Sequence, residues 1–278
     1  MRTVFALLFA AVLAASWGAP ALADEGGGSD PDTFIVSLRA RWWVPTVDGS
    51  FQINQHDYEG SYADYQDELD MEAFDPRNNP GVPELVLQAR LKGSGIIGTW
   101  VETSMQGDSW IERLEFNGRT FENEHLLTEL DFRLYRLTYI NHLLDAGFLK
   151  LAPMVGVGYL DYRAEVIPDP PDPPTHTGGN APFPYIGGQA LFRPPVDYLD
   201  YFEVVGEVTW SRGDWGDARL LYLEGYLGLS LRPIKFVSLG GGFRFFHLYA
   251  DAINVWSDDP DTILVTMGGP YFELEARF

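Results

Sequence analysis

The residues best suited to acid–base chemistry are His247, Tyr249 and Asp251, in the stretch FRFFHLYAD. In an extended chain, His247 and Tyr249 lie on one face with Asp251 just beyond them, so a histidine–carboxylate pair could act as a general base. No serine nucleophile accompanies the histidine, because the position two residues further on is Tyr249. A hydrogen-bonded histidine without a catalytic role is the preferred interpretation, and a hydrolase is the alternative.

Other candidates for metal or nucleophile chemistry are few. The remaining four histidines stand in predicted loops and turns and share no metal-ligand spacing: His56, His125, His142 and His176. The chain has no cysteine, which excludes disulfides, thiolate metal sites and cysteine nucleophiles. Acidic residues crowd the segment Pro45–Pro83 and could hold Ca²⁺ or Mg²⁺, but a solvated acidic loop is preferred because EF-hand spacing is absent. We therefore expect no cofactor.

The composition narrows the class of protein. A formal net charge of −21 repels nucleic acid phosphates and excludes nucleic acids as partners. Aromatic residues make up 14% of the chain, whereas acidic disordered chains are poor in aromatics, so the chain is expected to fold. Beyond the N-terminus, no segment approaches the roughly 20 apolar residues that a membrane-spanning helix needs.

The N-terminus has the organisation of a secretory signal peptide. Arg2 precedes an apolar run over Val4–Ser16, and Ala21-Leu22-Ala23 has the small-x-small form of a cleavage site. We expect a signal peptide over residues 1–23, with cleavage near Ala23, and a flexible acidic leader over residues 24–32. One domain then occupies residues 33–278, and it is either a soluble exported β protein or a transmembrane β-barrel.

Alternation of apolar and polar residues with a period of two predicts ten strands and no helix. The segments are Thr33–Val44, Glu84–Leu91, Ile96–Met105, Leu127–Ile140, Phe148–Arg163, Tyr185–Arg193, Phe202–Trp210, Leu220–Leu231, Phe236–Tyr249 and Leu264–Phe278. Their connections largely alternate between long and short, as in outer-membrane barrels with long extracellular loops and short periplasmic turns. The sequence therefore predicts an all-β, closed antiparallel transmembrane barrel of ten strands. Eight strands are the alternative, if Ile96–Met105 and Leu127–Ile140 form a hairpin outside the membrane.

Two local patterns add detail to this prediction. The second long loop, Gln106–Leu126, contains Asn117-Gly118 between short flanks, which is typical of a type I′ hairpin turn. We expect a separate hairpin above the membrane, because each arm is too short to cross a bilayer. Pro153 and Pro270 fall inside predicted strands, where each would remove a ladder hydrogen bond.

Pairs of aromatic residues indicate the height of the apolar face. Phe34 and Trp42 lie eight residues apart on one face of the first strand, and Phe202 and Trp210 repeat the spacing in the seventh. At about 3.3 Å per residue and a tilt near 40°, eight residues span roughly 20 Å, comparable with the ~25 Å apolar band between aromatic girdles. Phe278 is expected at the periplasmic girdle.

The polar face of a membrane barrel points inward, so the charged strand residues are expected in the lumen. They are Arg39, Arg41, Arg90, Arg133, Arg244, Arg277, Glu102, Asp131, Glu203, Glu207, Glu224, Glu273 and Glu275. Unpaired charges in a narrow lumen are costly, so we expect a bonded network that nearly fills the barrel. A narrow conducting path and a ligand site are the alternatives. Arg136 falls on the apolar face unless a β-bulge near Tyr135 shifts the phase.

With these features the chain resembles the small Gram-negative outer-membrane β-barrels of the OmpA/OmpW-like and porin-like kind. The resemblance rests on the Ala-x-Ala signal site, the ten alternating strands and the last strand, Leu264–Phe278, which ends in Phe. It implies that Phe272, Leu274 and Phe278 form the signal read by the barrel-assembly machinery. It also implies surroundings of outer-membrane lipid and lipopolysaccharide.

The expected function is that of a non-enzymatic outer-membrane barrel with a role in envelope integrity, surface interaction or limited passage of small solutes. One alternative is a hydrolase at the outer rim that acts on envelope lipid or peptide. Outer-membrane deacylases and proteases carry His-x-Ser or Asp-x-His elements that this chain lacks, which favours the non-enzymatic expectation. The other alternative is a soluble periplasmic barrel that binds lipid.

Overall fold

The computed structural model describes residues 34–53, 67–70, 81–91, 93–116, 119–168, 174–196, 201–215, 218–253 and 260–278. The predicted signal peptide and leader, most of the acidic first loop and the Asn117-Gly118 turn lie outside these residues. In the described part of the chain, no helix is long and apolar enough to cross a membrane.

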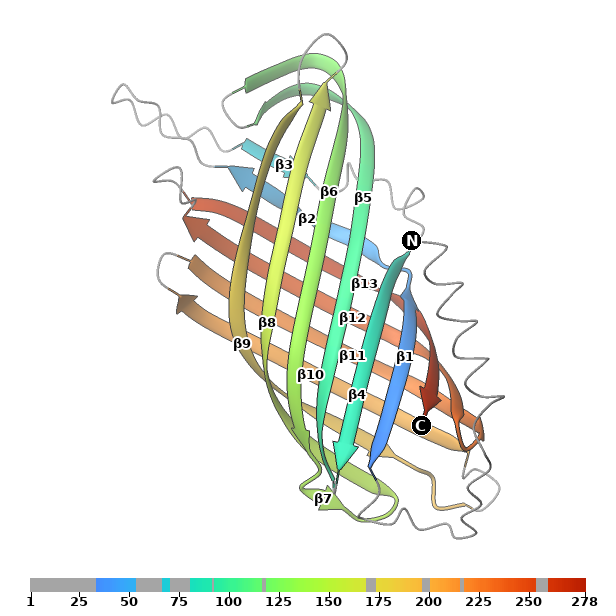
Figure 1. Cartoon of the computed structure of the whole chain (residues 1–278). Coiled ribbons are helices and arrows are strands. Elements are labelled where there is room, and N and C mark those ends of the chain that lie inside the picture. Colours follow the sequence, from blue (N-terminus) through green and yellow to red (C-terminus); the bar gives the residue numbers. More distant parts are fainter. Residues whose placement is uncertain are drawn as a thin grey trace.

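The described strands form one antiparallel sheet that closes on itself (Figure 1). They are β1 (Ile35–Trp43), β2 (Thr46–Ile53), β3 (Asp67–Asp70), β4 (Val82–Leu91), β5 (Ser94–Phe116), β6 (Arg119–Asn141), β7 (Leu144–Asp145), β8 (Leu149–Pro168), β9 (Thr175–Phe192), β10 (Phe202–Trp215), β11 (Ala218–Ile234), β12 (Val237–Ile253) and β13 (Pro260–Arg277). The order is β1-β4-β5-β6-β8-β9-β10-β11-β12-β13, and β13 pairs again with β1. β2 continues the line of β1 along β13, whereas β3 and β7 are short additions to β2 and β8.

The barrel has ten strands, as predicted, and the eight-strand alternative is wrong. β5 pairs with β4 on one side and with β6 on the other, and β6 in turn pairs with β8. Both strands are therefore part of the wall. The β4–β5, β6–β8 and β11–β12 connections lie at one end of the barrel, which we call the short-turn end. The opposite end, where β5 and β6 reach furthest, is the extended end.

Segments predicted as long loops are strands for much of their length. β5 and β6 stay paired from Ser94↔Asn141 to Phe116↔Arg119, so the expected separate hairpin is instead a continuation of two wall strands. β8 and β9 likewise stay paired as far as Val166↔Thr175. Continuous pairing satisfies the backbone groups of these residues, and Phe121, Leu126, Val166 and Phe183 are buried on the inward face.

Towards the extended end the wall divides into two facing sheets (Figure 1). β9 pairs with β10 only from Phe192↔Val204 to Ile186↔Trp210, whereas the β8–β9 and β10–β11 ladders continue beyond that point. The sheets are β4-β5-β6-β8-β9 and β10-β11-β12-β13-β2-β3. Their inward side chains form an apolar cluster that includes Phe132, Leu134, Leu160, Phe183, Phe246, Leu248, Ile263 and Val265. This part of the interior is packed like the core of a soluble protein.

The C-terminus closes the barrel. The Phe278 N–H donates to the Val36 carbonyl at 2.8 Å, and the Val36 N–H donates to the Phe278 carbonyl at 3.2 Å. The register then places Arg39 opposite Glu275 and Arg41 opposite Glu273. Two reciprocal hydrogen bonds between Phe278 and Val36 therefore hold the last residue against the first strand, as a closed barrel requires.

The two strand prolines lie where ladders are interrupted. Pro270 is opposite Val44, in the gap between β1 and β2, where Val44 N–H still donates to the Pro270 carbonyl at 2.9 Å. Pro153 lies between Leu151, the last β8 residue paired with β7, and Met154, the first paired with β6. Each proline thus lies where the ladder on one side is already broken, so its missing N–H interrupts no continuous run of ladder bonds there.

Candidate functional site inside the barrel

The polarity of the wall inverts along its strands. On β6 the outward residues near the short-turn end are Tyr135, Leu137 and Tyr139, and those further on are Glu129, Asp131 and Arg133. On β8 the outward residues change in the same way, from Val155, Val157 and Tyr159 to Asp161, Arg163 and Glu165. The inward residues of β6 change in the opposite sense, from Thr138 and Arg136 to Leu134, Phe132 and Leu130. Near the short-turn end the wall therefore has an apolar outer face and a polar inner face, as in a membrane barrel. Beyond Tyr135 and Tyr159 it has a polar outer face and an apolar inner face, as in a soluble protein.

Three residues predicted in the lumen lie on the outer face instead: Glu102, Asp131 and Arg133. The Arg133 side chain is 46% exposed, with its Nε 3.4 Å from Glu102 Oε1 and its Nη1 3.4 Å from Asp161 Oδ2. No bulge shifts the phase near Tyr135, because the registers of β6 with β5 and β8 run through it without interruption. Arg136 is inward and buried for the same reason.

The other ten predicted lumen residues lie on the inward face of the wall: Arg39, Arg41, Arg90, Glu203, Glu207, Glu224, Arg244, Glu273, Glu275 and Arg277. The structure adds Glu84 and Arg136, which the sequence interpretation did not place there. Glu84 is in phase with Gln88 and Arg90, so the alternation within β4 could have identified it. Arg136 could have been found only by assigning the inner face of β6 correctly.

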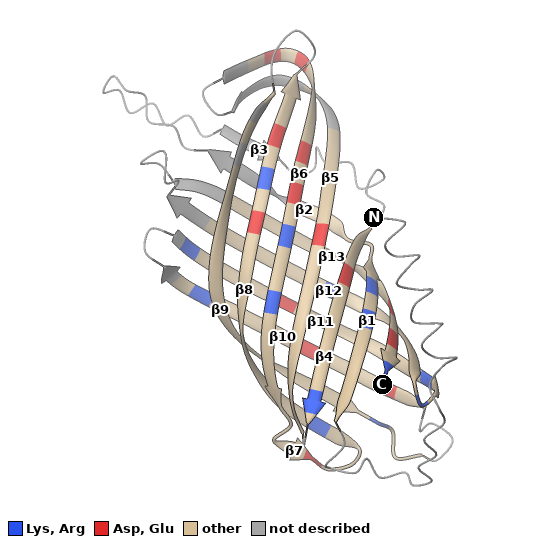
Figure 2. Ribbon diagram, in the orientation of Figure 1, with Lys and Arg blue, Asp and Glu red and all other residues tan. Residues whose placement is uncertain are grey.

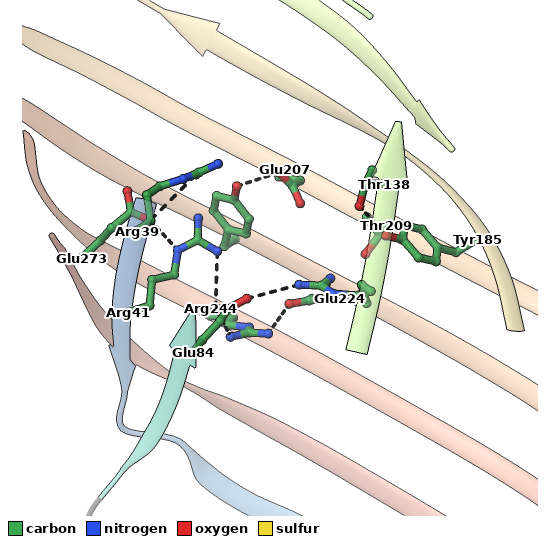
Figure 3. A network of polar contacts seen from close by, with 12 residues as sticks. Arg39, Arg41, Glu84, Thr138, Tyr185, Glu207, Thr209, Glu224, Arg244 and Glu273 are labelled. Atoms are coloured by element: carbon green, nitrogen blue, oxygen red, sulfur yellow. Dashed lines mark hydrogen bonds and ion pairs between the residues drawn. The ribbon is translucent and has the colours of Figure 1, made fainter. Parts of the chain in front are cut away.

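Six of these residues form a layer across the lumen, which we call the charged layer: Arg41, Glu84, Arg136, Glu224, Arg244 and Glu273 (Figure 3). They come from six strands, namely β1, β4, β6, β11, β12 and β13. The layer contains three bases and three acids. Its members lie far apart in the sequence, so closure of the barrel is what brings them together.

Glu84 is the centre of the layer, and its side chain is 0% exposed. Arg244 Nη1 donates to Glu84 Oε2 at 2.7 Å. Arg136 Nη2 lies 3.3 Å from Oε1, and Arg41 Nη1 lies 3.4 Å from Oε2. One carboxylate thus partly neutralises the charges of three buried guanidinium groups.

The remaining carboxylates complete the layer. Glu224 accepts hydrogen bonds from Arg136 and from the Tyr222 hydroxyl, and its Oε1 lies 2.5 Å from Arg244 Nη2. Glu273 accepts a hydrogen bond from Arg41 Nε. Aromatic faces cover the bases as well: Arg244 lies 4.6 Å from the Trp43 ring centroid, and Arg41 lies 4.5 Å from that of Tyr226.

The layer and the apolar cluster together close the lumen. Buried charges are costly unless they are paired, and every member of the layer makes at least one ion pair within it, although Arg136 Nε, Arg244 Nε and Glu224 Oε1 have no hydrogen-bond partner. The apolar cluster follows directly towards the extended end, with Trp43 and Tyr222 belonging to it and contacting the layer. The interior described by these residues is a packed plug.

Between the charged layer and the short-turn end lies a polar cavity of about 80 Å³, which we call the basic cavity. Seven basic residues line it: Arg39, Arg41, Arg90, Lys150, Arg193, Arg232 and Arg277. Its acidic lining residues are three: Glu203, Glu273 and Glu275. At its rim, Lys150 Nζ lies 2.7 Å from Asp145 Oδ2, and this bond, with one from the Gly147 N–H, holds the pKa of the Asp145 carboxyl below its ordinary value.

The predicted girdle and assembly residues all face outward. Phe34, Phe202, Trp210, Phe272 and Phe278 are exposed, and Trp42 and Leu274 are partly buried between neighbours. His247, the candidate general base, also faces outward, where its Nδ1 lies 2.9 Å from Thr266 Oγ1. The side chain of Asp251 lies outside the described residues. In the described part of the chain, no group of three or more His, Cys, Asp or Glu residues could hold a metal ion.

No model of a known protein family matches the chain, and no curated protein matches it by sequence. Among solved structures, the outer-membrane protease OmpT from Escherichia coli matches with a TM-score of 0.53 and 11% identity, over 91% of this chain and 99% of OmpT. The transport unit of the autotransporter AIDA-I from Escherichia coli has a TM-score of 0.38 and 8% identity, over 93% of this chain and 94% of that chain. Ail, the attachment invasion locus protein of Yersinia pestis, has a TM-score of 0.34 and 10% identity, over 86% and 98%. The structural neighbours are outer-membrane β-barrel proteins, and the match to OmpT shows the fold.

Proposed function

We propose that this chain is an integral outer-membrane β-barrel without enzymatic activity, with a closed lumen and a role in envelope integrity or in contacts at the cell surface. The observation that carries the proposal is the charged layer, which spans the lumen and is continuous with the apolar cluster. Of the three roles expected from the sequence, the passage of small solutes fits this interior least.

The outer surface supports a place in the membrane. Large apolar side chains point outward around the wall near the short-turn end, and Leu137, Val155 and Leu227 are 55%, 52% and 63% exposed. A water-soluble protein seldom exposes a continuous apolar band, whereas lipid would cover it. In our proposal the short-turn end faces the periplasm and the polar outer face of the extended end stands in water.

Two partners belong to the same proposal. Outer-membrane lipid and lipopolysaccharide would contact the outward apolar band and its polar margin. The barrel-assembly machinery would read the last strand through Phe272, Leu274 and Phe278. The exposure of Phe272 and Phe278 on the outer face supports this role, since a partner can reach them before lipid covers them.

The enzymatic alternative has less support. OmpT is a protease by its name, and it shares the fold at 11% identity. The residue on which the rim-hydrolase hypothesis was centred, His247, lies on the outer face of the wall and pairs with Thr266. A soluble lipid-binding barrel is also less favoured, because apolar side chains fill the interior where a lipid tail would lie.

Single-channel recording tests the closed lumen. The purified barrel, inserted into planar bilayers, is expected to give no defined conductance steps, whereas a 16-stranded porin in the same bilayers gives steps because its lumen holds water. Insertion is verified by protease protection of the reconstituted protein. Reproducible steps from verified, inserted protein would contradict the proposal.

A further inference from the structure

The basic cavity holds more positive than negative charge, in a chain whose formal net charge is −21. Figure 2 marks the Lys and Arg residues that contribute to this end of the barrel. Two of the three acidic lining residues are each shared by two bases. Glu273 pairs with Arg41 and lies 4.0 Å from Arg39, and Glu203 lies 3.3 Å from Arg193 and 3.6 Å from Arg232.

Among the basic residues that line the cavity, the charge of Arg90 is the least neutralised by acidic neighbours. The third acid, Glu275, is occupied by Arg277, whose Nη2 donates to its Oε2 at 2.7 Å. Among the described residues, Arg90 makes no ion pair and no side-chain hydrogen bond, although it lines the cavity and its Nε is buried. A guanidinium group in this position lacks the anion that would normally accompany it.

Unpartnered donors point to what the cavity would bind. Five buried polar atoms among its lining residues have no hydrogen-bond partner, of which four are donors and one is an acceptor: Arg39 Nε, Gln88 Nε2, Arg90 Nε, Arg232 Nε and Gln189 Oε1. Arg39 is 7% exposed and Gln88 is 3% exposed, so bulk water does not readily satisfy them. Gln88 Oε1 already accepts a hydrogen bond from Arg39 Nη2 at 2.9 Å, which leaves its Nε2 free to donate. Buried donors without partners are costly, and an acceptor among them would remove that cost.

We propose that the basic cavity binds a small tetrahedral oxyanion of the phosphate or sulfate type. Guanidinium and amide donors match the several oxygens of such an ion, and charge-assisted bonds to it are stronger than bonds to water. The volume of about 80 Å³ exceeds the roughly 10–15 Å³ that one water needs, and it suits a small ion better than a large solute. The charged layer closes one side, so the ion enters from the short-turn end. This site goes beyond the proposed function and does not depend on it.

The experiment is isothermal titration of the purified barrel, in an uncharged detergent at constant ionic strength, with inorganic phosphate, sulfate and chloride. We expect saturable binding of one phosphate or sulfate per chain and weaker binding of chloride. Arg90→Gln removes a base without an ion partner and is expected to weaken phosphate binding by about tenfold or more, as the loss of one charge-assisted bond does. Arg163→Gln is the matched control, because Arg163 faces outward and its side chain is 54% exposed. Phosphate binding by this variant is expected to equal that of the unmodified barrel.

Arg232→Gln provides a second test if Arg90→Gln fails to fold, since Glu203 keeps its pairing with Arg193. Absence of saturable phosphate or sulfate binding to the unmodified barrel would overturn the proposal, as would equal weakening by Arg90→Gln and Arg163→Gln. Glycerol phosphate is titrated in parallel. Tighter binding of glycerol phosphate than of inorganic phosphate would show that the site takes a phosphomonoester head group, and the free ion would then be the wrong occupant. The titration tests the anion site alone, and its result does not depend on whether the barrel conducts ions in planar bilayers.

Discussion

Replacing Glu84 by alanine is expected to destabilise the folded barrel by about 3–5 kcal/mol, the usual cost of removing one partner from a buried ion pair. Glu84 compensates Arg41, Arg136 and Arg244, and its removal leaves two carboxylates for three buried guanidinium groups. The measurement is the free energy of unfolding in urea, in lipid vesicles, followed by the fluorescence of the seven tryptophans of residues 33–278.

Glu102→Ala is the matched control for this variant. Glu102 also pairs with an arginine, but the pair lies on the outer face, where Arg133 is 46% exposed. Exposed pairs contribute at most about 1 kcal/mol, so the control is expected to stay within that range of the unmodified barrel. If Glu84→Ala were no more destabilising than Glu102→Ala, the charged layer would not be the compensated network described above.

Leu137→Arg is expected to destabilise the inserted barrel by about 2–4 kcal/mol, the cost of an arginine on the lipid face near the bilayer midplane. Leu137 is outward, 55% exposed and two residues on the short-turn side of Tyr135. Ser104→Arg introduces the same side chain at an outward position of the neighbouring strand β5, beyond the inversion of polarity. There it meets water and Glu129, whose Oε1 already accepts a hydrogen bond from Ser104 Oγ at 2.9 Å, so a change within about 0.5 kcal/mol is expected.

The comparison of these two arginines distinguishes lipid from water around the wall. Both variants are unfolded in the same vesicles by the same urea series. Equal effects would mean that the outward face has one environment along its whole length. A larger effect of Ser104→Arg would place the membrane at the wrong end of the barrel.

The strands and their closure could be predicted because they depend on local alternation. Alternation is clear in most of the ten segments, and Phe278 continues the phase of the last strand to its final residue. It is weaker in four segments: Ile96–Met105, Leu127–Ile140, Phe148–Arg163 and Tyr185–Arg193. Alternation also placed ten of the thirteen candidate lumen residues on the inward face. The exposed faces of Phe34, Trp210 and Phe278 follow from the same rule.

What alternation cannot decide is which of the two faces is the inner one. The expectation that the apolar face points outward holds near the short-turn end, but it fails for Asp131 and Arg133, where the inner face carries Phe132 and Leu134 instead. That assumption also made Arg136 look like an exception. In fact its strand keeps one phase throughout, and the surroundings of the wall change along it.

The site itself depends on closure of the barrel, which the sequence pattern does not describe. Glu84 and Arg244 are 160 residues apart and meet only because β4 and β12 face each other across the lumen. The basic cavity was not predicted either. Lys150 and Arg193 belong to its lining and lie inside predicted strands, but they were not among the candidate lumen charges, and Arg232 directly follows the predicted strand Leu220–Leu231.

The inversion of polarity at Tyr135 and Tyr159 is the central claim of this account, and spin-label accessibility tests it most directly. Because the chain contains no cysteine, Leu137→Cys and Ser104→Cys each provide a single labelling site. In vesicles, the label at position 137 is expected to be accessible to oxygen and protected from a water-soluble nickel complex, and the label at position 104 is expected to show the reverse. Access of the nickel complex to both labels alike would contradict the claim that lipid surrounds the barrel on the short-turn side of Tyr135.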